Sequence, residues 1–283
     1  MHLGTVAVLG AGTMAAAVLG GLAESADISV DEIRTTNRSQ QAAARWSGRP
    51  SVRAFALSDS PDANRQAVTD AHLILLGVKP AGVLTLLEEI ADRVEPSALV
   101  VSLAAGITLE AMAARLPPGV TIVRTAANTP SLVRAGVTGL ASTSADADQR
   151  DLINRLFAVL GEVFWVDEDE LHLLAAVSGS GPAYLYFVLE QFAQAAVEHG
   201  CAPDLAARLT EATFVGAAEL LRTTGLSPTE LRRQVTSPQG ATERAIAVLD
   251  QARLNEAFAA AMAAAMARTR EMGAGRDLAS WCR

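Results

Sequence analysis

The chain has 283 residues, half of them hydrophobic and 19% charged, which excludes a disordered protein and suggests two globular domains. A formal net charge of −8 argues against nucleic acid and anionic membranes as partners, and no apolar run reaches the roughly 18 residues that a membrane span needs. No signal peptide is visible, and the two cysteines (Cys201 and Cys282) and four histidines follow no disulfide or metal-ligating pattern, so we expect a reduced, cytoplasmic protein without a metal site.

The first half of the chain alternates short apolar runs with helical patterns. Unbroken apolar strands separated by helices are typical of a parallel sheet that is covered on both faces. The predicted strands are Thr5–Leu9, Ile33–Thr36, Ala71–Val78, Ala98–Leu103, Thr121–Thr125, Thr138–Ala141 and Glu162–Val166, with a helix over Met14–Leu22 after the first strand.

After Val166 the strand pattern stops, and glycine and proline separate a series of helices. The sequence therefore predicts an α/β domain over residues 1–166, an all-α substrate and dimerisation domain over 167–273 and a loose tail over 274–283. The predicted helices are Tyr184–His199, Asp204–Thr224, one that opens with the capping box Ser227-Pro228-Thr229-Glu230, Glu243–Leu249 and Leu254–Met272.

A turn rich in glycine follows the first strand. It reads Gly10-Ala11-Gly12-Thr13-Met14-Ala15, a G-x-G-x-x-A pattern in which Gly10 permits the tight turn, Gly12 lets a pyrophosphate approach the backbone and Ala15 keeps the helix close to the sheet. This context predicts a dinucleotide-binding site in a Rossmann-type doubly wound sheet, and a purely structural turn is the alternative to that site. The predicted dinucleotide contacts are Gly10, Ala11, Gly12, Thr13 and Met14.

The end of the second strand bears on which dinucleotide binds. Asn37, Arg38 and Ser39 follow this strand, whereas Asp31 and Glu32 lie before it. An NAD site would place an acidic residue at the strand end to hold the ribose 2′-OH. The Arg38 guanidinium and the donors of Asn37 and Ser39 suit a 2′-phosphate instead. We therefore expect NADPH as the cofactor and NADH as the weaker one, unless Arg38 is only a solvated surface charge.

Two further loops follow predicted strands, at the carboxyl ends where ligands bind in open α/β sheets. One contains Val78, Lys79 and Pro80, and we expect it to contact the cofactor, although Lys79 as a structural charge is the alternative. The other contains Ala104, Ala105 and Gly106, for which we expect the same.

Two loops lie within the helical half. Residues 178–184 read Ser-Gly-Ser-Gly-Pro-Ala-Tyr, where two glycines and a proline predict a break between helices. No base accompanies Ser178 or Ser180, so a serine nucleophile is not expected. Residues 236–242 read Thr-Ser-Pro-Gln-Gly-Ala-Thr and present free N–H groups at a helix start, which can hold a carboxylate. Ordinary capping by Ser237 or Thr242 is the alternative.

Together with the nucleotide motif, these two loops resemble the pyrroline-5-carboxylate reductase family over residues 3–272. The resemblance implies an NAD(P)H-dependent oxidoreductase that reduces Δ1-pyrroline-5-carboxylate to L-proline, the last step of proline biosynthesis, by hydride transfer to the cyclic imine. It also implies a homodimer of intertwined helices, or larger rings of such dimers. The same resemblance extends to Val78-Lys79-Pro80, Ala104–Thr108, Val123-Arg124 and Asn128-Thr129-Pro130.

The resemblance further implies roles for single residues. Gly240, Ala241 and Thr242 would hold the substrate carboxylate, and the Thr242 hydroxyl would bind the ring nitrogen. Ser178 would belong to the substrate-binding site and shape it. Glu168 would bind the substrate and act in catalysis by favouring the positive iminium, unless it belongs to a solvated acidic run. A substrate that arrives protonated needs no strong general acid, so positioning would supply most of the catalysis. Additional cofactor contacts are implied at Asn64, Asn128 and Gln234.

Several departures from the family pattern leave alternatives open. His172 and Ala175 replace Asp and Thr, and residues 126–127 read Ala-Ala where Met-Pro is common. Gln239 replaces a glycine, at a position whose backbone angles could be accessible to glycine only. A related imine or β-hydroxyacid reductase is one alternative, although residues 168–192 lack the lysine that a β-hydroxyacid enzyme should carry. A catalytically silent NADP-binding regulatory protein is the other.

Overall fold

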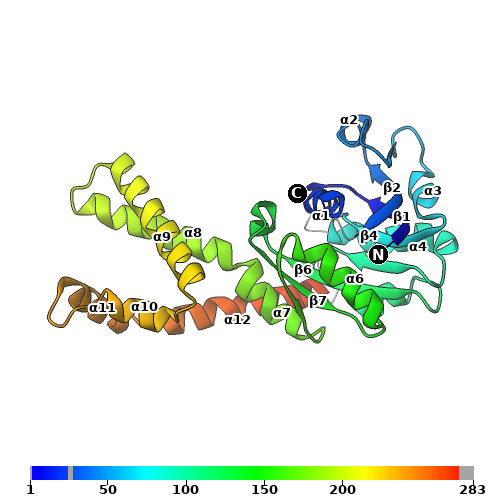
Figure 1. Cartoon of the computed structure of the whole chain (residues 1–283). Coiled ribbons are helices and arrows are strands. Elements are labelled where there is room, and N and C mark those ends of the chain that lie inside the picture. The colour runs from blue at the N-terminus through cyan, green and yellow to red at the C-terminus, as the bar shows by residue number, and fades with distance from the viewer. Residues whose placement is uncertain (1, 25–27, 274–283) are drawn as a thin grey trace. The chain divides into compact units, whose positions relative to one another are not determined.

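The computed structural model describes residues 2–24 and 28–273 (Figure 1). By its internal contacts the chain forms two compact units. The first contains the chain up to Ser180 together with the part that begins at Ala264, and the second contains Gly181–Ala263. The predicted tail over 274–283 lies outside the described residues.

Within the described residues, one eight-stranded sheet organises the first unit, in the order β3-β2-β1-β4-β5-β6-β7-β8. Every neighbouring pair is parallel except β6 and β7, so the prediction of a wholly parallel sheet is wrong at this point. Residues 128–135 alone join these two strands, and a parallel crossover needs a dozen residues or more. The strands are β1 (His2–Leu9), β2 (Ser29–Asn37), β3 (Val52–Ala56), β4 (Ala71–Leu76), β5 (Leu99–Ser102), β6 (Thr121–Ala127), β7 (Gly136–Ala141) and β8 (Gly161–Trp165).

Two strands differ from the sequence prediction. The edge strand β3 was not predicted, because its five residues include Arg53 and follow Pro50. β2 starts at Ser29, so Asp31 and Glu32 lie within the strand and not before it. The strand nevertheless ends at Asn37, and the absence of an acidic residue at that end is unchanged.

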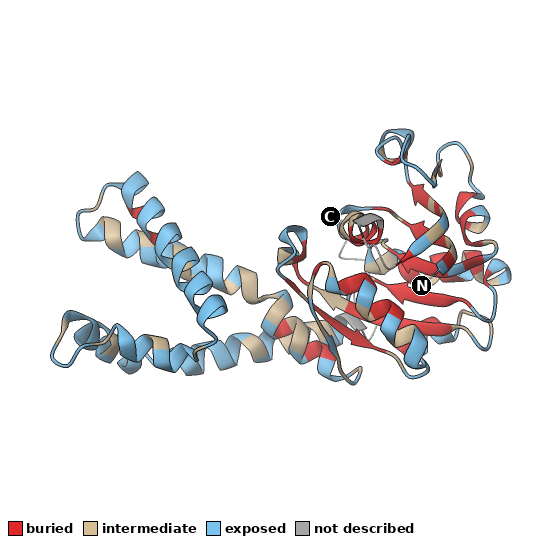
Figure 2. Cartoon of the chain, in the orientation of Figure 1, coloured by how far each residue is buried: buried red, intermediate tan, exposed pale blue. Residues whose placement is uncertain are grey.

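Both faces of the sheet are buried, as the apolar strands predicted. Val6 and Val8 of β1 point into a core that also contains Phe157, whereas Ala7 and Leu9 point into a second core on the other face. Figure 2 shows the buried strands between the helices. Helices α1 (Thr13–Glu24) and α6 (Ala147–Ala158) supply the first core, and α3 (Ala63–Val68), α4 (Pro80–Ile90) and α5 (Leu109–Ala113) supply the second, while α2 (Gln40–Ala43) precedes β3.

The predicted helix break at residues 178–184 is confirmed in part, because Ser180 forms a bend and a new α-helix begins at Gly181. Helix α7 (Glu170–Leu174) continues as a π-helix over Ala175–Gly179, and α8 (Gly181–Glu198) follows. Ser178 donates its hydroxyl to the Leu174 carbonyl at 2.9 Å, and the Asn128 amide donates to the Ser178 carbonyl at 3.0 Å. The wider π-turn therefore contains Gly179, and Gly181 begins α8 directly after the bend at Ser180.

The resulting helix over residues 170–198 is long and apolar enough to cross a membrane, judged by length and composition alone. The sequence contains no unbroken apolar run of that length, and this segment qualifies by its mean hydropathy, which tolerates polar residues within the helix.

The second unit is helical. It contains α8, α9 (Pro203–Thr224), α10 (Pro228–Gln234), α11 (Ala241–Gln251) and the start of α12 (Leu254–Gly273). The predicted capping box is confirmed, since the Ser227 hydroxyl and the Glu230 carboxylate cap α10 reciprocally. Most of its residues are exposed or intermediate in burial (Figure 2). Large apolar side chains are among the exposed ones, such as that of Phe187, which is 61% exposed.

Candidate functional site

The predicted nucleotide loops lie along one edge of the sheet. The strand register places Thr36, Leu9, Leu76, Ser102 and Arg124 in a single row across β2, β1, β4, β5 and β6. The loops that follow the first four of these strands therefore begin side by side. This edge is where open α/β sheets bind their ligands.

The glycine turn after β1 is shaped by contacts between neighbouring strand ends. Gly10 has a left-handed backbone with φ +76°, and its N–H donates to the Thr36 carbonyl at 3.0 Å. A Cβ on Gly77 would overlap the Gly10 carbonyl oxygen and would come within 3.1 Å of the Cβ of Ala15. Ala15 is buried, so a small side chain here keeps α1 close to the sheet, as predicted.

Gly12 differs from these residues. A Cβ built on Gly12 would meet no protein atom closer than the Gly10 carbonyl oxygen at 3.9 Å, so packing within the described chain does not require glycine. Its φ does not lie in the left-handed region either. The space over Gly12 is therefore open to a ligand, which fits the close approach of a pyrophosphate.

The end of β2 presents polar groups beside this turn. Asn37 is buried and donates to the Ala11 carbonyl at 3.3 Å, while its Oδ1 has no partner among the described residues. Arg38 is exposed and forms no ion pair within the described part of the chain. Ser39 accepts from the Ala42 N–H at 3.4 Å as the N-cap of α2, which leaves its hydroxyl hydrogen free to donate. A ribose phosphate could use all three groups.

The next two loops are also open at this edge. Lys79 is exposed and precedes Pro80, the first residue of α4, while Val78 is half-buried. Gly106 has φ +86°, which explains glycine there, and Ala105 is exposed beside the buried Ala104. These residues lie where the strand ends predicted them.

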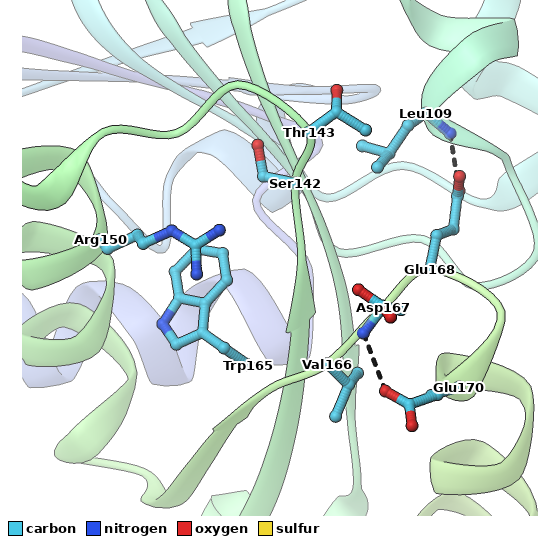
Figure 3. Close-up of a pocket in the computed structure, with 9 residues that line it drawn as sticks. All are labelled: Leu109, Ser142, Thr143, Arg150, Trp165, Val166, Asp167, Glu168 and Glu170. Carbon is cyan, nitrogen blue, oxygen red and sulfur yellow. Dashed lines mark hydrogen bonds between the residues drawn. The ribbon is translucent and has the colours of Figure 1, made fainter.

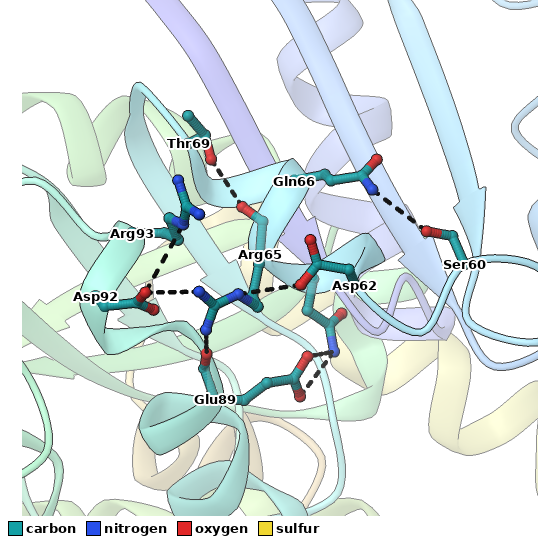
Figure 4. Close-up of polar contacts among 9 residues, drawn as sticks. Ser60, Asp62, Arg65, Gln66, Thr69, Glu89, Asp92 and Arg93 are labelled. Atoms are coloured by element: carbon teal, nitrogen blue, oxygen red, sulfur yellow. Dashed lines mark hydrogen bonds and ion pairs between the residues drawn. The ribbon is translucent and has the colours of Figure 1, made fainter.

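Asn64 and Asn128 have partners inside the protein. Asn64 is buried and donates to both carboxylate oxygens of Glu89 at 3.2 Å, beside the ion pairs that Arg65 makes (Figure 4). Asn128 accepts from the Val137 N–H at 2.8 Å and donates to Ser178. The structure gives both amides a structural role, so their cofactor contacts remain a prediction.

Glu168 lies on the rim of a cavity of about 290 Å³ at the carboxyl end of β8 (Figure 3). Its Oε1 accepts from the first N–H of α5, at Leu109, at 2.7 Å and from the guanidinium of Arg124 at 2.8 Å. The Arg124 side chain is only 5% exposed, so Glu168 neutralises a buried charge and caps a helix. The sequence reading missed this partner, although an arginine within a buried strand was a visible signal.

His172, one of the departures from the family pattern, is buried close to this ion pair. Its Nδ1 lies 3.2 Å from the hydroxyl of Thr269 in α12. That hydroxyl donates to the Met266 carbonyl, so it accepts from His172, and the imidazole carries its proton on Nδ1. Burial, then Arg124 and Arg270, lower the pKa of His172 below its ordinary value, while Asp169 and Glu168 oppose the shift.

The predicted carboxylate loop belongs to the second unit. Gln239 adopts φ +60°, the left-handed conformation that its family position suggested. Gly240 is the N-cap of α11, and the N–H groups of Ala241 and Thr242 have no acceptor within the described chain. The Thr242 side chain is exposed and likewise makes no hydrogen bond there. Gln234 is exposed at the end of α10.

Within residues 2–24 and 28–273, no three His, Cys, Asp or Glu side chains gather in a way that could hold a metal ion. The groups at both loops are instead hydroxyls, amides and backbone N–H donors. Such groups bind anions and polar ligands.

Family models match both parts of the chain. The model described as pyrroline-5-carboxylate reductase dimerisation matches residues 168–272, and that described as NADP oxidoreductase, coenzyme F420-dependent, matches residues 5–106. A solved structure described as a pyrroline-5-carboxylate reductase from Coxiella burnetii is 37% identical with a TM-score of 0.84, covering 94% of this chain and 97% of that one. A Plasmodium falciparum structure described with NADP bound is 22% identical with a TM-score of 0.77, covers 95% and 98%, and supports the fold.

Curated relatives agree over most of the length. The pyrroline-5-carboxylate reductase of Pseudomonas aeruginosa is 36% identical, covering 85% of this chain and 86% of its own. That of Escherichia coli is 30% identical, covering 94% and 97%. The chain therefore belongs to the pyrroline-5-carboxylate reductase family.

Proposed function

We propose that this protein catalyses the NADPH-dependent reduction of Δ1-pyrroline-5-carboxylate to L-proline. The observation that carries the proposal is the start of α11, where the N–H groups of Ala241 and Thr242 and the Thr242 hydroxyl have no partner in the described chain. The two N–H groups could bind an anion, and the hydroxyl beside them could donate or accept a hydrogen bond. This combination matches a substrate that has one carboxylate and one ring nitrogen.

The residues at the sheet edge suit NADPH. Gly10 to Met14 would hold the pyrophosphate at the start of α1, and the open space over Gly12 fits its approach. Asn37, Arg38 and Ser39 would bind the ribose 2′-phosphate, with Lys79 and the loop over residues 104–106 along the same edge. When bound, the cofactor supplies the hydride that reduces the imine carbon.

The chain's own residues bind and orient the substrate. The start of α11 holds the carboxylate through N–H donors, and the Thr242 hydroxyl bonds the ring nitrogen. When the carboxylate is bound there, the substrate ring can still rotate about the bond that joins it to the carboxylate. The hydrogen bond between Thr242 and the ring nitrogen would prevent that rotation. Proximity and orientation then lower the barrier, and no histidine is needed as an acid.

Glu168 has two competing roles. Its negative charge would favour the iminium if it faced the substrate, as the family resemblance suggests. The ion pair to Arg124 and the bond to α5 instead support a structural role that holds the end of β6. We favour the structural role, and a stability measurement separates the two.

We propose a cytoplasmic homodimer, with a ring of dimers as the larger assembly. The dimerisation model covers residues 168–272, so the apolar helix over residues 170–198 fits a subunit interface better than a membrane. We place the functional boundary between residues 166 and 167, directly after the sheet, although α7 belongs by its contacts to the first unit.

A substrate panel tests the activity. Purified protein with NADPH is given Δ1-pyrroline-5-carboxylate, a piperideine carboxylate or a set of hydroxyacids, and NADPH oxidation is followed. We expect the pyrroline to have the highest kcat/KM. A preference for the piperideine would indicate a related imine reductase, and tight NADPH binding without any turnover would indicate a regulatory protein.

A further inference from the structure

The loop before α11 contains a residue in an unfavourable backbone conformation. Gln239 has φ +60°, in the left-handed region of backbone conformation. This region is unfavourable in free energy for every residue except glycine, because the Cβ comes close to the backbone. One contact supports this conformation: the Gln239 N–H donates to Oε2 of Glu243 at 2.8 Å. Glu243 therefore holds the backbone at a position where the sequence lacks the glycine that the family pattern leads us to expect.

The same contact leaves the helix start free. In a capping box the acidic residue at the third helical position bonds the N–H of the N-cap. Here the Gly240 N–H donates to the Ser237 carbonyl at 3.0 Å, and Glu243 reaches one residue further, to Gln239. The carboxylate next to the helix start thus occupies none of its first-turn donors, and α11 has no side-chain cap among the described residues.

The residue after Gln239 is also constrained by close contacts. A Cβ on Gly240 would overlap the Ser237 hydroxyl oxygen and would come within 3.0 Å of the Ser237 carbonyl oxygen. Glycine at 240 thus permits the close turn, and Glu243 fixes the residue before it. Together they determine where the N–H groups of Ala241 and Thr242 point.

We propose that Glu243 is a positioning residue for substrate binding: it stabilises the left-handed Gln239 and so keeps the N–H groups of Ala241 and Thr242 directed at the substrate carboxylate. This inference rests on the proposed reduction of Δ1-pyrroline-5-carboxylate. Loss of the Glu243 contact would let the loop populate other conformations. The apparent affinity for the substrate would then fall in proportion to the fraction of molecules whose loop keeps the binding conformation.

A kinetic double-mutant cycle tests the proposal, with wild type, Glu243→Ala, Gln239→Gly and the double variant. Glu243→Ala should raise the KM for the pyrroline about five- to tenfold and leave the KM for NADPH unchanged, because the loop only positions the substrate. The double variant should stay within about twofold of Gln239→Gly, because glycine adopts φ +60° without support. Glu243→Gln, which keeps an acceptor, should resemble wild type.

Two results would overturn this role. One is an equal loss from Glu243→Ala whether it is made in the wild-type protein or in the Gln239→Gly variant, and the other is a parallel rise in the KM for NADPH. If wild type turns over the pyrroline and the cycle shows no coupling, only the role of Glu243 is rejected. If wild type does not turn it over, the proposed function is rejected and this role with it.

Discussion

At the nucleotide edge, two glycines serve different purposes. Gly77 is required by the protein itself, since a Cβ there would overlap the Gly10 carbonyl oxygen, whereas the space over Gly12 is open. The sequence pattern predicts a ligand beside Gly12. The structure adds that packing within the described chain requires glycine at 77 and does not require it at 12.

This difference predicts opposite outcomes for two alanine substitutions. Gly12→Ala should leave the thermal midpoint within the error of wild type but weaken NADPH binding about tenfold or more, because the methyl group enters ligand space. Gly77→Ala is the matched control and should lower the thermal midpoint. Equal destabilisation by both substitutions, in thermal melts, would contradict the assignment.

Arg38 is the residue at which we expect the protein to distinguish NADPH from NADH. Loss of a charge-assisted bond to a 2′-phosphate costs about 1.5–3 kcal/mol, so Arg38→Ala should raise the KM for NADPH at least about tenfold. The KM for NADH should change little, since NADH lacks that phosphate. The two constants, measured on the same preparation, test the assignment, and an equal rise in both would contradict it.

Glu168 is the residue whose role the structure revises most. Removing it would leave Arg124 buried without a counter-charge, so we expect Glu168→Ala to lower the free energy of unfolding by about 2–3 kcal/mol in urea titrations. Glu162→Ala, at an exposed position, should change it by less than about 0.5 kcal/mol. A Glu168→Ala protein with unchanged stability and much lower kcat would support the catalytic role instead.

Among the elements, the short apolar strands and the capped helices were predictable from the sequence, and three features were not. β3 is an edge strand whose charged Arg53 hides the pattern, and the β6–β7 pair is antiparallel because its connection is short. The π-turn over Ala175–Gly179 was the third, and there the amide of Asn128, fifty residues earlier, donates to the Ser178 carbonyl. Local propensity predicts the break at the glycines but not this distant contact.

The candidate site was predictable where a motif fixes the backbone, as at Gly10 and Gln239. The site was not predictable where the role of a side chain depends on which of several possible groups it bonds. Asn64 and Glu168 match family positions, yet each bonds a group that lies far away in the sequence, Glu89 and Arg124. Sequence spacing carries no information about such pairs until the register of the sheet is known.

The packing of α7 against α12 predicts a dependence of stability on pH. The pKa of His172 is lowered in the folded protein, so the unfolded chain binds more protons as pH falls below the ordinary value of 6.5. This contribution to stability is complete above that value and is lost below it. The urea midpoint should therefore fall between about pH 7.5 and about pH 5.5.

Two substitutions isolate the effect of that histidine. His172→Gln should flatten the fall in the urea midpoint, because the titrating group is gone. His199→Gln, at an exposed histidine, should leave the fall unchanged. The same slope in all three proteins would contradict a role for His172 in it.

At the scale of the whole molecule, the second unit cannot bury its apolar side chains alone. Phe187, Val215 and Val248 are each more than 60% exposed, and such surfaces mark subunit interfaces. The dimerisation model matched over residues 168–272 gives the reason.

Phe187 tests this interface directly. Phe187→Glu places a charge on the exposed apolar face of α8 and should shift light-scattering mass from dimer to monomer, because an unpaired buried charge is costly at an interface. Gln41→Glu adds the same charge to an exposed site in α2 and should leave the mass unchanged. A wild-type monomer, or a Phe187→Glu dimer, would contradict the interface.

Hydride transfer to the ring carbon of the cyclic imine can be followed directly with a labelled cofactor. The protein is incubated with Δ1-pyrroline-5-carboxylate and with NADPH that carries deuterium at both C4 positions of the nicotinamide, and the product is examined by NMR. We expect L-proline that carries deuterium at C5. Absence of proline, or deuterium at another position, would contradict the proposed reduction.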